Sequence, residues 1–436
     1  MITAFVNARM FDGIDRHLKD GLTVLVEEDR IKAVGEDIVL SPDTQVIDCQ
    51  GKVLTPGLID GHVHLVANSV DLSAGRQWPS FVYSQARHIM ECMLARGFTT
   101  VRDGGGADAG LVHAVEGGWI AGPRLIISGL ALSQTGGHGD MRSVHLTAGE
   151  NTTHRIGSMI ARVCNGVAEV REAARDELRK GAHFIKIMAS GGAASVTDPI
   201  DNTQFSAEEL AAIVEEAVAW NTYVMAHAYT PRAIEAVVNA GGRTIEHGNL
   251  IDATTARLMA SHDVWLCPTL VASDILTQFA DRYGFSETSM KKIAHVRERG
   301  LEGLKIARDN DVKIGFGTDL LGIELHHYQC DEFTLRARVE NPVDTLLSAT
   351  GLNAQMMRME GLVGSIVPGA FADILVIDAD PTTDATAFTK QGENLDVIMK
   401  GGVSSRTASR TDLITHTDRE FAERSVTSPM VDVFKP

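Results

Sequence analysis

The chain has 436 residues, 44% of them hydrophobic, which is enough for one large domain and a smaller one with well-filled cores. Its formal net charge of −17 would repel a phosphate backbone, and no basic cluster offsets that charge, so nucleic acid is not an expected partner. No apolar run approaches the roughly 18 residues of a membrane-spanning helix, and charges interrupt the first residues where a signal peptide would be apolar. We therefore expect a cytoplasmic protein that is not bound to a membrane.

The two ends of the chain have the same β-type pattern. Residues 1–55 contain short runs such as LTVLVEEDRIKAV, separated by Gly and Asp turn signals, and a similar pattern returns in SIVPGAFADILVID from Gly364 onward. We expect residues 1–55 and 354–402 to form one small β-sandwich domain. Residues 403–436 are polar and rich in Ser and Thr, so we assign them to a C-terminal tail, either docked or disordered.

After Thr55-Pro56-Gly57 the pattern changes to short apolar strands that alternate with helical stretches, which is typical of a parallel sheet. One helix is predicted to begin at a capping box of Ser206 and Glu209. The next is predicted to begin at Thr230-Pro231 and to end at Gly241-Gly242. These signals predict an α/β region over residues 56–353.

The predicted strands of this region cover residues 58–63, 99–102, 124–128, 184–188, 223–226, 244–246, 264–267 and 314–317. Eight parallel strands with intervening helices are typical of a (β/α)₈ TIM-type barrel, whose chemistry lies at the C-terminal ends of the strands. The predicted fold is therefore α/β, a TIM-type barrel with a small β-sandwich domain built from both chain ends.

Metal-ligating residue types are found at these strand ends. His62 and His64 end the first strand, and alternation directs both imidazoles to one side. His227, His247 and Asp319 follow the fifth, sixth and eighth strands. An isolated HxH pair can equally be two ordinary strand histidines, but scattered structural histidines would not gather at one edge of a barrel. We therefore expect a metal site there.

Lys186 ends the fourth strand inside the apolar run FIKIMAS, where an isolated ammonium would be costly to bury. It could be a snorkelling or carboxylate-paired lysine. Alternatively, its deprotonated amine could react with CO₂ to give a carbamate, whose two oxygens could bind two cations.

The six residues at their strand ends, together with LTPGLIDGHVH, resemble the binuclear branch of the amidohydrolase superfamily over nearly the whole chain up to about residue 402. The resemblance implies that His62, His64 and Asp319 bind one divalent ion, that His227 and His247 bind a second, and that carbamylated Lys186 bridges them. It further implies that a bridging hydroxide attacks an amide carbonyl, while Asp319 transfers the proton to the leaving nitrogen. Zinc suits these ligands best, and Mn, Co and Fe are compatible with them.

Within the superfamily, LTPGLIDGHVH, TTVRDGGG, the GGH loop and HAY are similar to a group that includes imidazolonepropionases and prolidase-like Xaa-Pro dipeptidases. Lys186 favours the binuclear peptidase side. The resemblance suggests that His138 contacts the scissile carbonyl, although a loop histidine without a role is the alternative. Tyr229 could bind a substrate carboxylate or only pack. Arg102 could bind that carboxylate or form a salt bridge at the barrel rim.

The predicted function is a binuclear zinc hydrolase that cleaves Xaa-Pro dipeptides or N-acyl amino acids. One alternative is a hydrolase of a non-peptide amide, carbamate or cyclic amide on the same centre, and another is a structural homologue without catalysis. The expected partner is a small molecule or dipeptide, and we expect a homo-oligomer.

Overall fold

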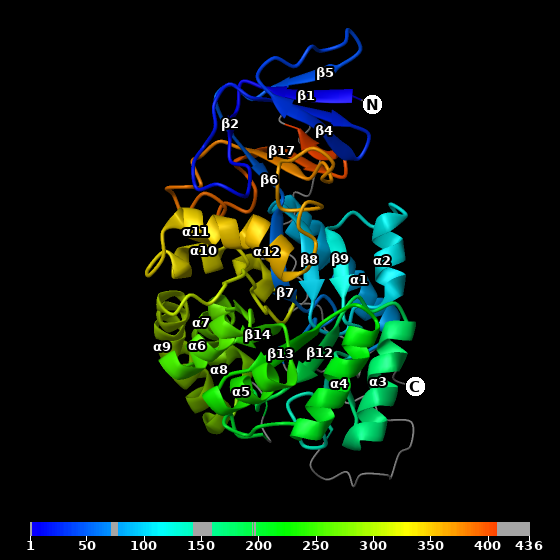
Figure 1. Cartoon of the computed structure of the whole chain (residues 1–436), viewed down its shortest axis with the longest axis vertical. Helices are drawn as coiled ribbons and strands as arrows, with labels where there is room; N and C mark the ends of the chain where they lie inside the picture. Colours follow the sequence, from blue (N-terminus) through cyan, green and yellow to red (C-terminus); the bar gives the residue numbers. More distant parts are fainter. Residues whose placement is uncertain (1, 71–76, 143–158, 194, 196–197, 408–436) are drawn as a thin grey trace, which may run out of the picture.

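The computed structural model describes residues 2–70, 77–142, 159–193, 195 and 198–407. Strands from the two ends of the chain gather at one end of the molecule, and alternating strands and helices form the larger remainder (Figure 1). In the part of the chain that is described, no helix has the length and apolar character needed to cross a membrane.

Two sheets are built from the chain ends. One has the order β4-β3-β1-β5, with β1 at Ile2–Val6, β3 at Thr23–Glu27, β4 at Arg30–Gly35 and β5 at Gln45–Asp48. The other has the order β18-β17-β16-β6-β2, with β2 at Arg9–Met10, β6 at Val53–Pro56, β16 at Ile374–Ile377, β17 at Leu395–Lys400 and β18 at Val403–Thr407. Strand β16 pairs antiparallel with β6, which joins segments about 320 residues apart.

The two faces of β16 belong to different hydrophobic cores. Ile374 and Val376 pack with Phe5, Val24 and Leu54 between the two sheets. Leu375 and Ile377 point the other way and pack with residues of β7–β9 and their helices. The alternation of a β-strand thereby attaches the chain-end sheets to the part of the molecule that holds the predicted metal ligands.

The remaining strands form two parallel sheets. A three-stranded sheet contains β7 (Leu58–Val63), β8 (Phe98–Asp103) and β9 (Arg124–Ile127). A six-stranded sheet has the order β11-β10-β12-β13-β14-β15, with β10 at Ala131–Ser133, β11 at Ala161–Val163, β12 at Ile185–Met188, β13 at Val224–Ala228, β14 at Thr244–His247 and β15 at Trp265–Cys267. The short strands β10 and β11 are additional to those predicted from the sequence.

Helices alternate with these strands and cover them. They are α1 (Pro79–Ala95), α2 (Ala109–Glu116), α3 (Gly166–Arg179), α4 (Ala207–Ala219), α5 (Pro231–Ala240), α6 (Ala253–Ser261), α7 (Leu270–Gln278), α8 (Ala280–Tyr283), α9 (Glu287–Asp309), η2 (Leu325–Tyr328), α10 (Asp331–Arg336), α11 (Pro342–Leu347), the π-helical turn η3 (Ser348–Leu352) and α12 (Asn353–Met356). The predicted helix signals are confirmed: Ser206 and Glu209 form a capping box, and α5 begins at Pro231 and ends at Gly241 in the left-handed conformation.

The prediction of an eighth strand at residues 314–317 is wrong, although the segment lies where that strand was expected. Ile314 forms a single parallel bridge with Leu266, and Phe316 accepts a backbone hydrogen bond from Gly61. The segment also makes backbone hydrogen bonds on both sides, because Gly315 N donates to Leu266 O and Thr318 N donates to His62 O. The Asn353 side chain adds to these contacts, since its Oδ1 accepts from Phe316 N and its Nδ2 donates to Phe316 O. The Phe316 N–H is thus bound by a side chain, and the strand ladder is interrupted at this residue.

The start of the predicted C-terminal tail is part of the five-stranded sheet, because Val403–Thr407 form β18. The rest of that predicted tail, residues 408–436, lies outside the described residues.

Leu54→Ala should lower the free energy of unfolding by about 2–5 kcal/mol, because Leu54 is fully buried between the chain-end sheets and truncation leaves a cavity. Denaturant unfolding would measure the change. The matched control is Val46→Ala on exposed β5, which should cost less than about 1 kcal/mol. Equal losses in the two variants would contradict the placement of Leu54 in this core.

Candidate metal centre and active site

The structure brings the six predicted metal ligands together around one cavity of about 60 Å³. Their side chains come from the end of β7, from β12, β13 and β14, and from the segment after residue 317; they are His62, His64, Lys186, His227, His247 and Asp319. Asp319 Oδ1 lies 3.4 Å from His62 Nε2 and 3.3 Å from His64 Nε2. Lys186 Nζ lies 3.3 Å from His62 Nε2, and Lys186 is almost fully buried.

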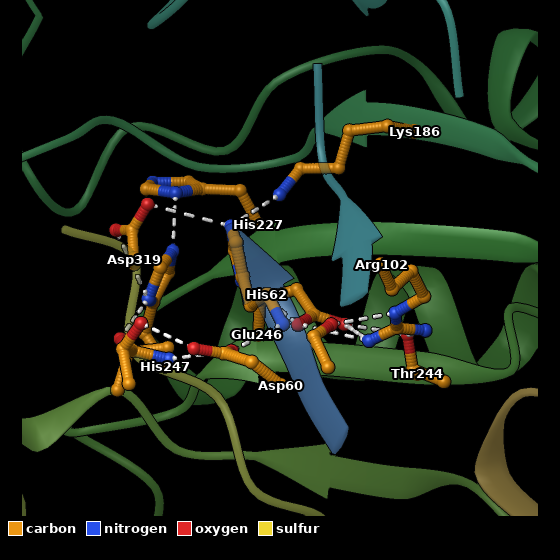
Figure 2. A network of polar contacts seen from close by, with 12 residues as sticks. Asp60, His62, Arg102, Lys186, His227, Thr244, Glu246, His247 and Asp319 are labelled. Carbon is orange, nitrogen blue, oxygen red and sulfur yellow. Dashed lines mark hydrogen bonds and ion pairs between the residues drawn. The ribbon is translucent and has the colours of Figure 1, made fainter. Parts of the chain in front are cut away.

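Each of the four histidines has one ring nitrogen held by a protein group outside the cluster. His62 Nδ1 lies 2.9 Å from Glu246 Oε2, and His64 Nδ1 lies 3.1 Å from Gly105 O. Similarly, His227 Nε2 lies 3.2 Å from Gly191 O, and His247 Nδ1 lies 2.7 Å from Thr269 Oγ1. Figure 2 shows the imidazoles of His62, His227 and His247 converging with Asp319 and Lys186.

The second ring nitrogen of each histidine is directed at the other ligands. His227 Nδ1 and His247 Nε2 are 2.8 Å apart, and the Nε2 atoms of His62 and His64 both face Asp319. Contacts of this kind fix the ring orientation and the tautomer of metal-ligating histidines in proteins. The arrangement therefore directs four ring nitrogens and one carboxylate toward a common space.

Burial keeps three of these histidines neutral. It is the main cause that lowers the pKa of His62 and of His227 well below the ordinary value, and it lowers the pKa of His247 to about 4. Burial also lowers the pKa of His64, but the hydrogen bond and charge of Asp319 outweigh it, so that the net pKa is raised. A cation bound beside Asp319 would replace the proton that this pair otherwise holds.

The electrostatics of Lys186 and Asp319 complement this pattern. Desolvation lowers the pKa of Lys186, which favours the uncharged amine. Burial raises the pKa of Asp319, but His62, His64 and His247 together hold it below its usual range as a carboxylate. Neutral imidazoles with a carboxylate are ligands that suit divalent zinc and related ions, so the donor set fits the predicted metals.

The backbone is strained where two of the ligands sit. His247 has a φ of 73° and Asp319 a φ of 51°, in the left-handed region that residues with a Cβ seldom occupy. Such strain costs on the order of 1–3 kcal/mol at each position and is concentrated at functional sites. The backbone at Gly317 passes close to His62. A Cβ on Gly317 would lie 2.8 Å from His62 Cβ, so glycine is required there.

Two of the three predicted substrate contacts line the same cavity. The His138 ring is stacked on His227 with centroids 4.4 Å apart, and its Nδ1 lies 3.2 Å from Ser195 Oγ. The Tyr229 ring is stacked on His247 with centroids 5.0 Å apart. Burial of His138 lowers its pKa, so its imidazole is neutral near pH 7.

Arg102 does not line the cavity, which corrects its prediction as a substrate-binding residue. Its side chain is fully buried, its Nη2 donates to both carboxylate oxygens of Glu246 at 3.0 and 3.2 Å, and its Nε donates to Gly61 O. The physical reason is that Glu246, Gly61 O and the Thr244 hydroxyl together engage all three guanidinium nitrogens inside the protein, away from the cavity. The alternative of a structural salt bridge is the one observed.

Sequence reasoning missed two buried carboxylates that support the ligands. Glu246 binds Arg102 and His62, and Asp60 accepts from the His62 backbone N–H and from the Thr318 hydroxyl (Figure 2). Both could have been suspected, since Glu246 directly precedes His247 in an apolar strand and Asp60 shares a strand face with His62.

The segment after β12 lines the cavity through Ala193, and its anchoring was also missed. Lys292 of α9 donates its Nζ protons to Gly192 O at 2.7 Å, Ser195 O at 2.6 Å and Asp198 O at 2.9 Å. Ser195 in turn contacts His138, and a Cβ on Gly192 would lie 1.8 Å from His138 Cε1. Lys292 therefore fixes the loop that sets the His138 ring.

A match to the model of the amidohydrolase family covers residues 53–404. The chain belongs to the amidohydrolase family. Members of this family generally use metal ions, and His62, His64 and Asp319 form a group that could hold one. The protein is an enzyme that hydrolyses amide or peptide bonds, and the alternative of a non-catalytic homologue is set aside.

Known relatives of this amidohydrolase include hydrolases with different names. It is 32% identical over 372 residues to ochratoxinase from Aspergillus niger. The aligned region covers 80% of this chain and 75% of that protein. A prolidase crystallised with N-methylphosphonate-L-proline has a TM-score of 0.90 and 44% identity, covering 93% of this chain and 100% of that chain. An Xaa-Pro dipeptidase with bound methionine has a TM-score of 0.83 and 27% identity, with coverage of 93% and 100%. These fold neighbours are of the TIM-barrel type.

Lys292→Met should speed amide hydrogen exchange in the segment containing Gly192, Ser195 and Asp198 by about tenfold or more, because three carbonyls lose a charged donor. Hydrogen exchange with mass spectrometry measures this. Lys291→Met is the matched control, because the Lys291 side chain is 75% exposed and pairs only with Glu287 in the described structure. Unchanged exchange in Lys292→Met would refute the anchoring role.

Proposed function

We propose that this amidohydrolase is a prolidase-like dipeptidase or N-acyl amino acid hydrolase with two divalent ions, cleaving the amide before a C-terminal residue such as proline. The observation that carries the proposal is the convergence of four histidine nitrogens, Lys186 and Asp319 on one cavity. The likeness to a prolidase crystallised with N-methylphosphonate-L-proline supports the substrate class.

In this proposal, His62, His64 and Asp319 would hold one ion, and His227 and His247 would hold the other. Zinc is the preferred metal because imidazole and carboxylate ligands suit it. When bound, such ions supply Lewis acidity, which acidifies water and polarises a carbonyl group.

Lys186 would join the two subsites as a carbamate. Its uncharged amine would bond to the carbon of CO₂ and release one proton, which leaves a carbamate whose single negative charge is shared by two oxygens. Support comes from the burial of Lys186 and from the contact of Nζ with His62 Nε2, a neighbour that does not neutralise an ammonium.

The roles of the remaining residues follow from their positions. Asp319, whose side chain is 20% exposed, would accept a proton from the attacking water and donate it to the leaving nitrogen. His138 would donate a hydrogen bond to the scissile carbonyl, and the Tyr229 hydroxyl would bind the carboxylate of the substrate. Met188, Leu276, Ile293 and Leu321 give the cavity an apolar wall, which suits a hydrophobic substrate side chain.

A second candidate is hydrolysis of a non-peptide amide, carbamate or cyclic amide at the same centre. The identity of 32% with ochratoxinase favours keeping it, since that relative is not named as a dipeptidase. The two candidates share the metal centre and differ in what the apolar wall accepts.

We propose in addition that residues 56–353 close into a (β/α)₈ barrel and that residues 1–55 with 354–402 form a separate β-sandwich domain. Support comes from backbone hydrogen bonds that link the two parallel sheets through neighbouring segments. Gly61 N of β7 donates to Phe316 O, and Gly315 N donates to Leu266 O of β15. On the other side, His183 N, just before β12, donates to Ile127 O of β9. The homo-oligomeric state and the cytoplasmic location stay predictions.

The purified, metal-loaded enzyme should release free amino acid from Xaa-Pro dipeptides or N-acyl amino acids at least about 100-fold faster than Asp319→Asn, because that variant cannot relay the proton. Chromatography of the released amino acids over a substrate panel measures this. Turnover of non-peptide amides alone would select the second candidate, and release of no product from either class would refute both.

Chelation should abolish activity, and zinc with bicarbonate should restore it together with two ions per chain. Lys186→Ala should hold fewer ions and show no response to bicarbonate, because it has no amine to carbamylate. Elemental analysis of dialysed protein gives the metal content, with exposed Lys291→Ala as the control. Two ions bound by Lys186→Ala with wild-type affinity would contradict a bridging carbamate.

A further inference from the structure

A buried carboxylate connects the metal centre to a buried guanidinium. Glu246 and Arg102 are both fully buried, and Arg102 Nη2 donates to Oε1 and Oε2 of Glu246 at 3.0 and 3.2 Å. The Thr244 hydroxyl donates to Oε1, and Oε2 lies 2.9 Å from His62 Nδ1 (Figure 2). Among the described residues, these close contacts of the carboxylate are all with hydrogen-bond donors.

This contact decides which nitrogen of His62 carries the proton. An ionised carboxylate only accepts hydrogen bonds, so Nδ1 of a neutral His62 must be protonated to face Glu246 at 2.9 Å. The lone pair is then on Nε2, which faces Lys186 Nζ at 3.3 Å and Asp319 Oδ1 at 3.4 Å. Only this tautomer can offer a ligand atom to a cation in the cavity.

Arg102 holds Glu246 in place from a neighbouring sheet. Arg102 lies in β8, its Nε donates to Gly61 O in β7 at 2.6 Å, and its Nη1 donates to the Thr244 hydroxyl in β14 at 3.3 Å. Glu246 is also followed directly in β14 by His247. The ion pair thus joins the strand that carries His62 to the strand that carries a ligand of the other proposed ion.

We infer that Glu246, held by Arg102, is a positioning residue that fixes His62 as the Nδ1–H tautomer and thereby creates a ligand of the first metal ion. This inference rests on the proposed function for the presence of that ion, whereas the tautomer itself is a property of the metal-free chain.

Glu246→Gln is the most informative substitution because it replaces the carboxylate by an amide of the same size. Arg102 and Thr244 both donate to the Oε1 position, so the amide oxygen should remain there and the NH₂ group should take the Oε2 position. That NH₂ would donate to His62 Nδ1 and move the proton to Nε2, where it blocks the ligand atom. Arg102→Met in the same chain removes the charged donor, which allows the amide to turn its oxygen back toward His62.

The metal test compares Zn²⁺ affinity by equilibrium dialysis with elemental analysis. Glu246→Gln should lose about 10- to 100-fold in affinity for one of the two ions. The double variant Arg102→Met/Glu246→Gln should recover most of that loss, which a merely structural role would not produce. Glu216→Gln is the matched control and should bind both ions as wild type does, because Glu216 is also a buried carboxylate paired with an arginine, Arg175, but does not line the cavity. Wild-type affinity in Glu246→Gln, or a further loss in the double variant, would overturn the inference.

The tautomer test needs no metal. Nitrogen-15 NMR of histidine-labelled, metal-free protein reports which ring nitrogen of His62 carries hydrogen, with the signal assigned by its loss in His62→Gln. We expect Nδ1–H in the wild type and Nε2–H in Glu246→Gln; the same tautomer in both would overturn the inference. A wild type that binds fewer than two ions but gives the expected tautomers would refute only the binuclear proposal.

Discussion

The contacts that occupy one nitrogen of each buried histidine are the constraint on which this active site depends. Four imidazoles from three strands lie against a lysine and a carboxylate, and each ring is fixed by a different polar group: Glu246, Gly105 O, Gly191 O and the Thr269 hydroxyl. Without these partners, the rings could rotate or exchange tautomers, and their ligand atoms would not share one direction. The remainder of the fold places these four groups.

Burying such a cluster without a bound cation raises the free energy of the folded state. Neutral imidazoles, a buried amine and a carboxylate lose their hydration, and His247 and Asp319 add backbone strain. The large hydrophobic cores on either side offset this free energy. The Arg102–Glu246 ion pair beneath the ligands contributes little to stability, but it defines a unique arrangement of side chains when every partner is present. Its role is best understood through the histidine that it orients.

The two proposed substrate contacts are held by ring stacking and not by hydrogen bonds to the ligands. His138 and Tyr229 are stacked on two of the ligands, so their rings move with the centre, whereas the loop above them is attached through Lys292 to α9. A shared metal centre with a variable wall is consistent with relatives named as a prolidase and as an ochratoxinase. In the proposed function, the ligand geometry would define the class of reaction, while side chains from α7 and α9 that line the cavity would select the amide.

Sequence patterns alone predicted the alternation of strands and helices and the capping of α4 and α5, and they placed the candidate ligands at strand ends, because strand periodicity and helix caps are local and strand ends meet at one edge of a parallel sheet. The ligand role of Lys186 was implied by the family resemblance. Tertiary structure decided what no local pattern contains. Arg102 could not be assigned from sequence because its partner, Glu246, lies 144 residues away, and the same holds for Lys292 and the loop near Gly192. The segment at residues 314–317 has the apolar composition of a strand, yet the Asn353 side chain binds both backbone polar groups of Phe316 and interrupts the ladder there. Residue type and spacing therefore identified which groups could bind a metal, and only packing between distant segments decided which group each ring nitrogen faces.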